Sequence, residues 1–113
     1  MIYNIIPTEK FKKEAKRLIK KYPSLKIELM GLNNQLALNP EMGAPLGNNS
    51  YKIRLAIKSK GKGKSGGARI ITYLIDEHLE IYLLTIYDKA EFDSIDDKTL
   101  RRIISNIDNE TNG

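Results

Sequence analysis

The chain has 113 residues, no cysteine and one histidine. Its length fits a single domain, and 41% apolar with 29% charged residues indicates a globular rather than a disordered chain. The composition excludes disulfides, thiolate metal sites and cysteine nucleophiles, and one histidine argues against a multi-histidine metal site. We therefore expect one domain over residues 1–113, no metal or other cofactor, no signal peptide or membrane span, and a cytoplasmic location.

Charge is distributed unevenly along the chain. Residues 1–51 carry 8 basic and 4 acidic side chains, residues 52–75 carry 7 basic and no acidic ones, and residues 76–113 carry 4 basic and 10 acidic ones. The middle block creates a local positive potential, for which polyanions are natural partners. A solvated loop that only keeps the protein soluble explains the same block equally well.

The first part of the chain predicts a strand and two helices. Residues 2–6 are rich in β-branched and aromatic side chains, as strands are. Apolar residues recur at helical spacing over Phe11–Tyr22, with Thr8 as the predicted N-cap. A second helical pattern follows Ser24, its predicted cap, and closes at Pro40. The connection between the two patterns is short, which predicts an antiparallel helical hairpin.

The middle of the chain predicts a loop, a strand and a second loop. Residues 40–50 hold two prolines and two glycines, which is typical of a loop. Over Tyr51–Lys58 the period changes to two, which predicts a strand with Lys52, Arg54 and Lys58 on one face. The glycine-rich residues 60–67 predict a flexible hairpin loop.

The last part of the chain predicts two strands and a helix. Residues 68–75 and 79–87 read as strands joined by a tight turn. Ser94 is the predicted cap of a final helix that ends near Ile107, with residues 108–113 as a frayed tail. The order β-α-α-β-β-β-α predicts one α+β domain, in which the helical hairpin packs on a largely antiparallel four-stranded sheet.

Neither a glycine pattern after residue 60 nor the lone histidine predicts a functional site. The glycines of Gly61-x-Gly63-x-x-Gly66 match the dinucleotide fingerprint, but that fingerprint must open a helix, and a strand is predicted here. The lone His78 lies in a predicted turn between acidic residues, where a solvated side chain is the simplest interpretation.

A strand with several cations on one face suits one metal-free reaction on a polyanion. In RNA the 2′-hydroxyl can attack its own phosphodiester, a step that needs a base, cations around the phosphorane and an acid. A lysine serves as a base where neighbouring cations favour its neutral form, and Lys52 lies beside Arg54. Arg69 can clamp phosphate. Tyr87 and Lys89 can add a stacking or proton-handling ring and a further cation.

The same residues also have a purely structural interpretation. Lys52 and Arg54 would then be edge-strand charges that oppose aggregation. Arg69 would form a salt bridge, and Tyr87 would be an aromatic at the rim of the core.

Three segments resemble the RelE/ParE superfamily of toxin–antitoxin toxins. They are Tyr51–Ala56, the basic loop into Gly66–Ile71, and Ile81–Lys89, in this order and spacing. The resemblance covers nearly the whole chain and is nearest to the RelE- and HigB-like branches. It implies a microbial-RNase-like fold and an endoribonuclease that cuts messenger RNA in the ribosomal decoding site, inhibits translation and arrests growth.

The resemblance also implies site residues and partners. Lys52 and Arg54 match the basic pair on the second predicted strand, Arg69 the arginine that enters the third, and Lys89 and Tyr87 the late cation and tyrosine. Some HigB members have a histidine in the site, and this chain has none there, which leaves Lys52 or Tyr87 for proton transfer. The implied partners are messenger RNA on the ribosome and a cognate antitoxin.

The basic loop is the predicted contact with phosphate and ribosomal RNA, through Lys58, Lys60, Lys62 and Lys64. Two other functions remain open. A ParE-like protein would share the fold and inhibit DNA gyrase by binding, and a non-catalytic relative would only bind nucleic acid. The density of basic residues on the second strand favours the nuclease.

Overall fold

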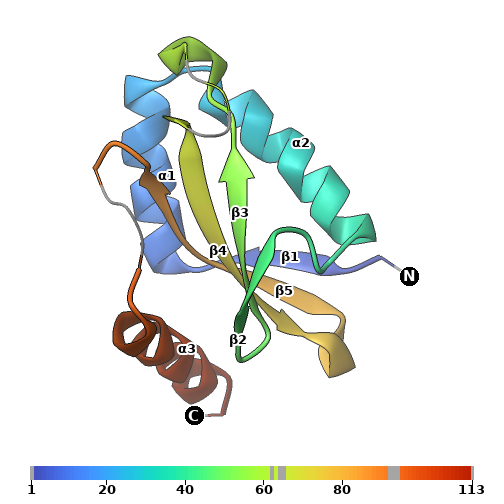
Figure 1. Cartoon of the computed structure of the whole chain (residues 1–113). Coiled ribbons are helices and arrows are strands. Elements are labelled where there is room, and N and C mark those ends of the chain that lie inside the picture. The colour runs from blue at the N-terminus through green and yellow to red at the C-terminus, as the bar shows by residue number, and fades with distance from the viewer. Residues whose placement is uncertain (1, 62, 64–65, 92–94, 113) are drawn as a thin grey trace.

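The computed structural model describes residues 2–61, 63, 66–91 and 95–112, with residues 108–112 described by their backbone only. Figure 1 shows a sheet with helices packed around it. In chain order the helices and strands are β1 (Asn4–Pro7), α1 (Glu9–Lys21), α2 (Leu25–Leu38), β2 (Ala44–Gly47), β3 (Ser50–Leu55), β4 (Ala68–Ile75), β5 (Glu80–Asp88) and α3 (Asp97–Asn112). The short 3-10 turns η1 (Lys58–Lys60) and η3 (Asp76–His78) follow β3 and β4.

Among the described residues the sheet has five strands, in the order β1-β5-β4-β3-β2, so the prediction of four strands is wrong. The additional strand is β2, which pairs antiparallel with β3. Its sequence, Ala-Pro-Leu-Gly, has turn residues and no alternation, and all four residues are exposed. Proline is tolerated on such an edge strand because one row of its backbone groups needs no partner.

The sheet is mixed, although most of its pairings are antiparallel. The β2–β3, β3–β4 and β4–β5 pairs are antiparallel, and β1 pairs with β5 in parallel. Parallel neighbours need a long connection between them. The helical hairpin and three further strands separate β1 from β5 along the chain and provide that connection. The N-terminal strand therefore forms the edge opposite β2.

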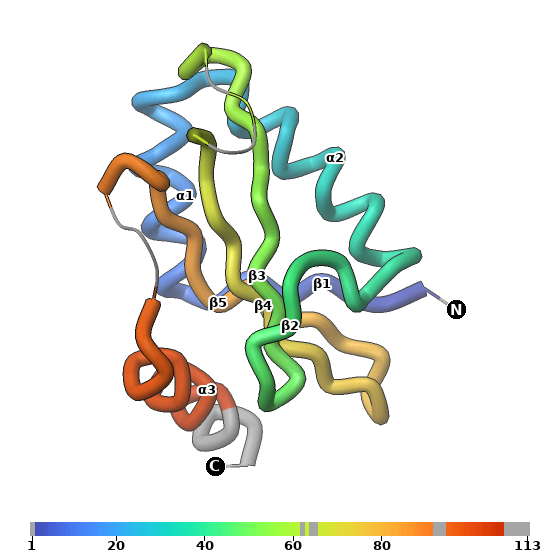
Figure 2. The backbone as a smooth tube through the Cα atoms, viewed as in Figure 1, coloured from blue at the N-terminus to red at the C-terminus, as the bar shows by residue number. Residues whose placement is uncertain are grey.

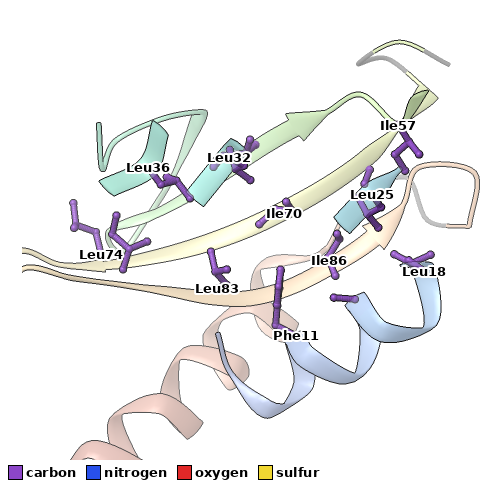
Figure 3. Packing of buried hydrophobic residues seen from close by; sticks show 14 residues of the cluster. Phe11, Leu18, Leu25, Leu32, Leu36, Ile57, Ile70, Leu74, Leu83 and Ile86 are labelled. Carbon is purple, nitrogen blue, oxygen red and sulfur yellow. The ribbon is translucent and has the colours of Figure 1, made fainter. Parts of the chain in front are cut away.

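Helices α1 and α2 form the predicted hairpin and cover one face of the sheet. Phe11 and Leu18 of α1 and Leu32 of α2 are buried in one cluster with Ile70 and other sheet residues (Figure 3). The prediction that Thr8 caps α1 is confirmed, because its hydroxyl oxygen accepts the Phe11 amide hydrogen at 3.1 Å.

Ser24 precedes α2, but its side chain has a different role from the predicted cap. Its hydroxyl donates to Glu28 at 3.2 Å and accepts the Ser59 amide hydrogen at 2.9 Å. Glu28 also accepts the Lys58 amide hydrogen at 2.7 Å. The turn between the helices therefore binds η1 and fixes the start of the basic loop.

Helix α3 packs on the other face of the sheet, away from the helical hairpin (Figure 2). Its Leu100, Ile104 and Ile107 are buried against Leu84 and Tyr87. The helix begins at Asp97, so its cap is Asp96, whose carboxylate accepts the Thr99 amide hydrogen at 2.7 Å. Within the part of the chain that the structure describes, no helix is long and apolar enough to cross a membrane.

Two sequence predictions for the chain end fall partly outside the described residues. The predicted cap Ser94 is not among them. Within the predicted tail, residues 108–112 are described by backbone alone and are helical through Asn112, and Gly113 lies outside the described residues.

Strand β3 is shorter than predicted, which changes the position of Lys58. The strand ends at Leu55, and Lys58 begins η1 instead of extending the basic strand face. The alternation persists in the burial pattern, since Ile53 and Ile57 are buried and Arg54 is exposed. The cause is the anchoring of residues 58 and 59 to the helical hairpin, which draws the chain away from the sheet.

Candidate active site

A row of three candidate side chains crosses the middle of the sheet. In the register of the antiparallel pairs, Arg54 of β3 lies opposite Arg69 of β4, which lies opposite Tyr87 of β5. Residues directly opposite each other share a face and have Cβ atoms about 5 Å apart. The neighbouring row, with Ile53 opposite Ile70, belongs to the core under α1 and α2, so the Arg54–Arg69–Tyr87 row lies on the α3 side.

Lys52 lies on the same face as this row, two residues before Arg54 along β3. It is half-buried and lies opposite Ile71. Arg54 is exposed, whereas Arg69 and Tyr87 are only 4% and 3% exposed. The face therefore has an open end at Arg54 and a closed end at Tyr87.

Of the two buried members of the row, Arg69 acts electrostatically on the Tyr87 phenol. Burial raises the pKa of the Tyr87 phenol, and the nearby Arg69 charge partly opposes that effect. The phenol is therefore protonated at neutral pH and can donate a proton or a hydrogen bond. The Arg69 guanidinium donates to the Ala68 carbonyl oxygen at 3.1 Å, which aligns it along β4.

Lys89 lies just beyond β5, at the end of the sheet where β4 begins. Its amide donates to the Gly67 carbonyl oxygen at 3.0 Å, and its side chain is half-buried. A Cβ at Gly67 would come within 2.1 Å of the Leu55 carbonyl oxygen, so only glycine permits this approach of β3 and β4. The strand ends that carry the candidate cations thus converge.

The lysines of the basic loop have different surroundings. Lys58 is exposed in η1. Lys60 is 12% exposed at its side chain and forms an ion pair with Asp88. Lys62 and Lys64 lie outside the described residues. Of the loop lysines in the described part of the chain, Lys58 is therefore the one that projects into solvent.

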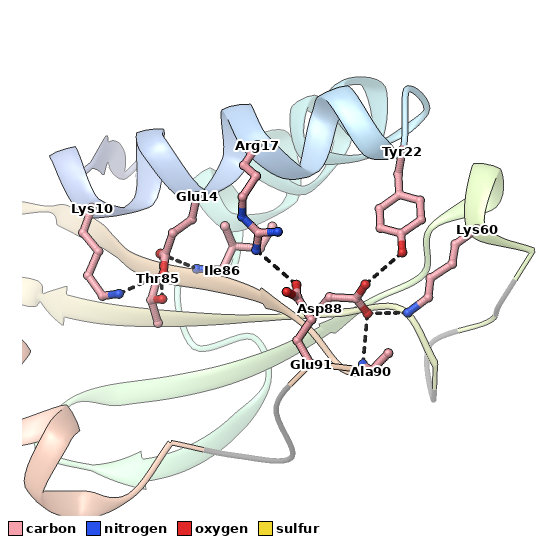
Figure 4. Close-up of polar contacts among 10 residues, drawn as sticks. All are labelled: Lys10, Glu14, Arg17, Tyr22, Lys60, Thr85, Ile86, Asp88, Ala90 and Glu91. Carbon is pink, nitrogen blue, oxygen red and sulfur yellow. Dashed lines mark hydrogen bonds and ion pairs between the residues drawn. The ribbon is translucent and has the colours of Figure 1, made fainter.

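Asp88 collects donors from three segments of the chain (Figure 4). One oxygen accepts the Tyr22 hydroxyl at 2.9 Å, and the other accepts the Ala90 amide at 3.0 Å and pairs with Lys60. The Lys60 ammonium also lies 5.7 Å from the centre of the Tyr22 ring. Burial alone raises the pKa of the Asp88 carboxyl, but the hydrogen bonds and the Lys60 charge outweigh burial and lower it.

A pocket of about 310 Å³ opens beside Tyr87, between α1, β5 and α3. Lys10, Glu14 and Arg102 line it together with Tyr87. Glu14 accepts hydrogen bonds from the Thr85 hydroxyl at 2.7 Å and from the Ile86 amide at 3.3 Å. These donors lie on the part of β5 beyond its pairing with β1. Lys10 forms an ion pair with the same carboxylate at 2.8 Å.

Sequence reasoning missed two carboxylates at this end of the molecule. Asp88 carried a usable signal, since it is an acidic residue between two candidate site residues at the end of an apolar strand. Glu14 gave no such signal, because many helices have a glutamate on their polar side and the contact with β5 exists only in the tertiary structure.

No protein family model matches the sequence. Several solved structures match its fold, among them these two. One is a mutant of the E. coli toxin RelE in the free state, with a TM-score of 0.64, 17% identity, and coverage of 95% of this chain and 99% of that chain. The other is the intact E. coli RelBE toxin–antitoxin complex, with a TM-score of 0.59, 20% identity, and coverage of 76% of this chain and 95% of that chain. The chain therefore has the RelE-like α+β fold.

Proposed function

We propose that this protein is the toxin of a type II toxin–antitoxin system and a metal-independent endoribonuclease that cuts messenger RNA on the ribosome. The observation that carries the proposal is the row of Arg54, Arg69 and Tyr87 in register on one face of a RelE-like sheet. Lys52 on the same face and Lys89 at the converging strand ends complete the proposed site.

The proposed reaction needs no group from outside the chain. The 2′-oxygen attacks the adjacent phosphorus, the bond to the 5′-oxygen breaks, and the products are a 2′,3′-cyclic phosphate and a 5′-hydroxyl end. Lys52 takes the 2′-hydroxyl proton, and Tyr87, which burial keeps protonated, donates to the leaving oxygen. Arg54, Arg69 and Lys89 stabilise the charge on the phosphorane.

The proposed partners follow from the same surface. Lys58 is the described loop lysine that can contact RNA phosphates, with Lys62 and Lys64 as further proposed contacts. The Lys60 ammonium forms an ion pair with Asp88 and is therefore not among the proposed RNA contacts. A cognate antitoxin is the proposed protein partner, and the cytoplasm, where ribosomes are, is the proposed location.

Mapping the 5′-ends of transcripts after brief expression of the protein tests the proposal. We expect new ends within coding regions for the wild type, and their loss with Arg69→Ala. Arg101→Ala removes an exposed arginine on α3, outside the proposed site, and should leave the ends in place. Intact messages together with broken DNA would instead indicate a ParE-like gyrase inhibitor. RNA binding without cutting, even on ribosomes, would indicate a non-catalytic relative.

A further inference from the structure

We infer that Asp88 is a positioning residue of the proposed active site, which it serves by tying the end of β5 and the stem of the basic loop to α1. This inference rests on the proposed function. Asp88 lies between Tyr87 and Lys89 in the sequence but on the opposite face of the strand from Tyr87. It therefore acts on the proposed site through the backbone and not by contact with RNA.

The contacts of Asp88 use both carboxylate oxygens. The side chain is 1% exposed, and its donors come from the end of α1 (Tyr22), from η1 (Lys60) and from the turn after β5 (Ala90). A carboxylate this buried is tolerated only with such a set of donors. Figure 4 shows the donors converging on it from separate elements.

Two of these links lead directly to proposed site residues. The Ala90 amide bond turns the chain just after β5, which places the Lys89 amide against the Gly67 carbonyl oxygen at 3.0 Å. Asp88 itself lies opposite Ala68, the neighbour of Arg69. Movement of Asp88 would therefore displace Lys89, and it would shift β5 against β4 at the Arg69–Tyr87 pair.

Stability alone does not account for this arrangement. Well-packed apolar side chains in place of a buried ion pair are often as stable or more stable. What an apolar pair lacks is directional oxygen acceptors for the Tyr22 hydroxyl and the Ala90 amide. The network thus provides geometry that hydrophobic packing would not.

The test compares the rate of messenger RNA cleavage on programmed ribosomes between the double variant Lys60→Met/Asp88→Leu and wild type. We expect the double variant to remain folded, with a single-turnover cleavage rate at saturation about 100-fold lower and a half-saturating concentration within about threefold of wild type. The single variant Lys60→Arg, which preserves the charge pair, should retain most of the wild-type cleavage rate. The matched control is Arg17→Met/Glu91→Leu, which removes an exposed ion pair of 3.0 Å between α1 and the same turn and should leave the rate unchanged.

The outcomes separate the inference from the proposed function. A folded double variant with the wild-type rate overturns the inference. So does a variant that loses only affinity, because Lys60 would then act as an RNA contact. If the wild type does not cleave, the proposed function fails, and amide hydrogen exchange of Lys89 decides the inference. Faster exchange in the double variant supports the network, and unchanged exchange overturns it.

Discussion

The two faces of the sheet are built differently. The face under α1 and α2 is a continuous apolar core, in which Leu18, Leu25 and Ile70 are fully buried. The face toward α3 has a smaller apolar cluster, which includes Tyr87, and the row that runs from Tyr87 through Arg69 to Arg54. Most of the buried apolar side chains thus lie between the helical hairpin and the sheet, and the other face can carry charges that a core would exclude.

This difference separates stability from function in the molecule. Substitutions of the apolar core residues under the hairpin should change the free energy of unfolding and leave the chemistry of folded molecules intact. Substitutions of the exposed Arg54 and the half-buried Lys52 should instead lower the cleavage rate and change the free energy of unfolding little.

The double variant Lys52→Ala/Arg54→Ala should lower the rate of RNA cleavage about 1,000-fold, because it removes the proposed base and a cation that stabilises the phosphorane. Neither side chain is part of the core, so the midpoint of thermal unfolding should change little. Rate and unfolding are measured on the same preparation. A folded variant that still arrests growth would reject the proposed site.

Leu18→Ala should lower the free energy of unfolding by about 3 kcal/mol, because Leu18 is fully buried and the truncation leaves a cavity. Urea unfolding monitored by circular dichroism measures the effect. The cleavage rate per folded molecule should remain that of the wild type. A parallel loss of rate would show that the apolar core under the hairpin also contributes to the chemistry.

Tyr87→Phe should lower the cleavage rate about 100-fold, since it removes the proposed proton donor while keeping the buried ring. Because burial holds the pKa of Tyr87 above its usual value, the phenol of the wild type remains protonated through pH 9. The wild-type rate should therefore show no decline from Tyr87 ionisation up to that pH. An unchanged rate in the phenylalanine variant would remove Tyr87 from the mechanism.

The smallest expected effect is the loss of the Asp88 contribution to stability at acid pH. Its pKa is lowered in the folded protein, so its contribution to stability is complete above the unfolded-state pKa and is lost as the pH falls through the folded-state pKa, below about pH 4. The stability difference between wild type and Asp88→Asn should therefore shrink on acidification from neutral pH to pH 3. A difference independent of pH would mean that the charge of Asp88 does not stabilise the fold.

Much of the fold was predictable because its elements have clear periodicity. The apolar spacing around Phe11 and Leu18 predicted α1, and β4 has the predicted bounds, Ala68–Ile75. The fifth strand, β2, was missed because an exposed edge strand with proline and glycine has the composition of a loop. The end of β3 was misplaced because the bonds of Lys58 and Ser59 to the hairpin override the alternating pattern.

The candidate site was less accessible to prediction. Alternation on β3 placed Lys52 and Arg54 on one face, but the position of Arg69 and Tyr87 opposite them depends on strand register. The loop lysines looked alike in sequence, yet Lys60 is engaged by a buried carboxylate and Lys58 is exposed. Such pairing depends on contacts between residues far apart in the chain.

The sequence by itself determined the helices, most of the strands and the concentration of positive charge between residues 52 and 75, because periodicity and composition are local properties. Only the tertiary structure decided which edge β1 joins, how α3 covers Tyr87, and which lysine Asp88 binds. Those outcomes depend on register and on competition between distant groups for burial and hydrogen bonds, which no segment of the chain encodes alone.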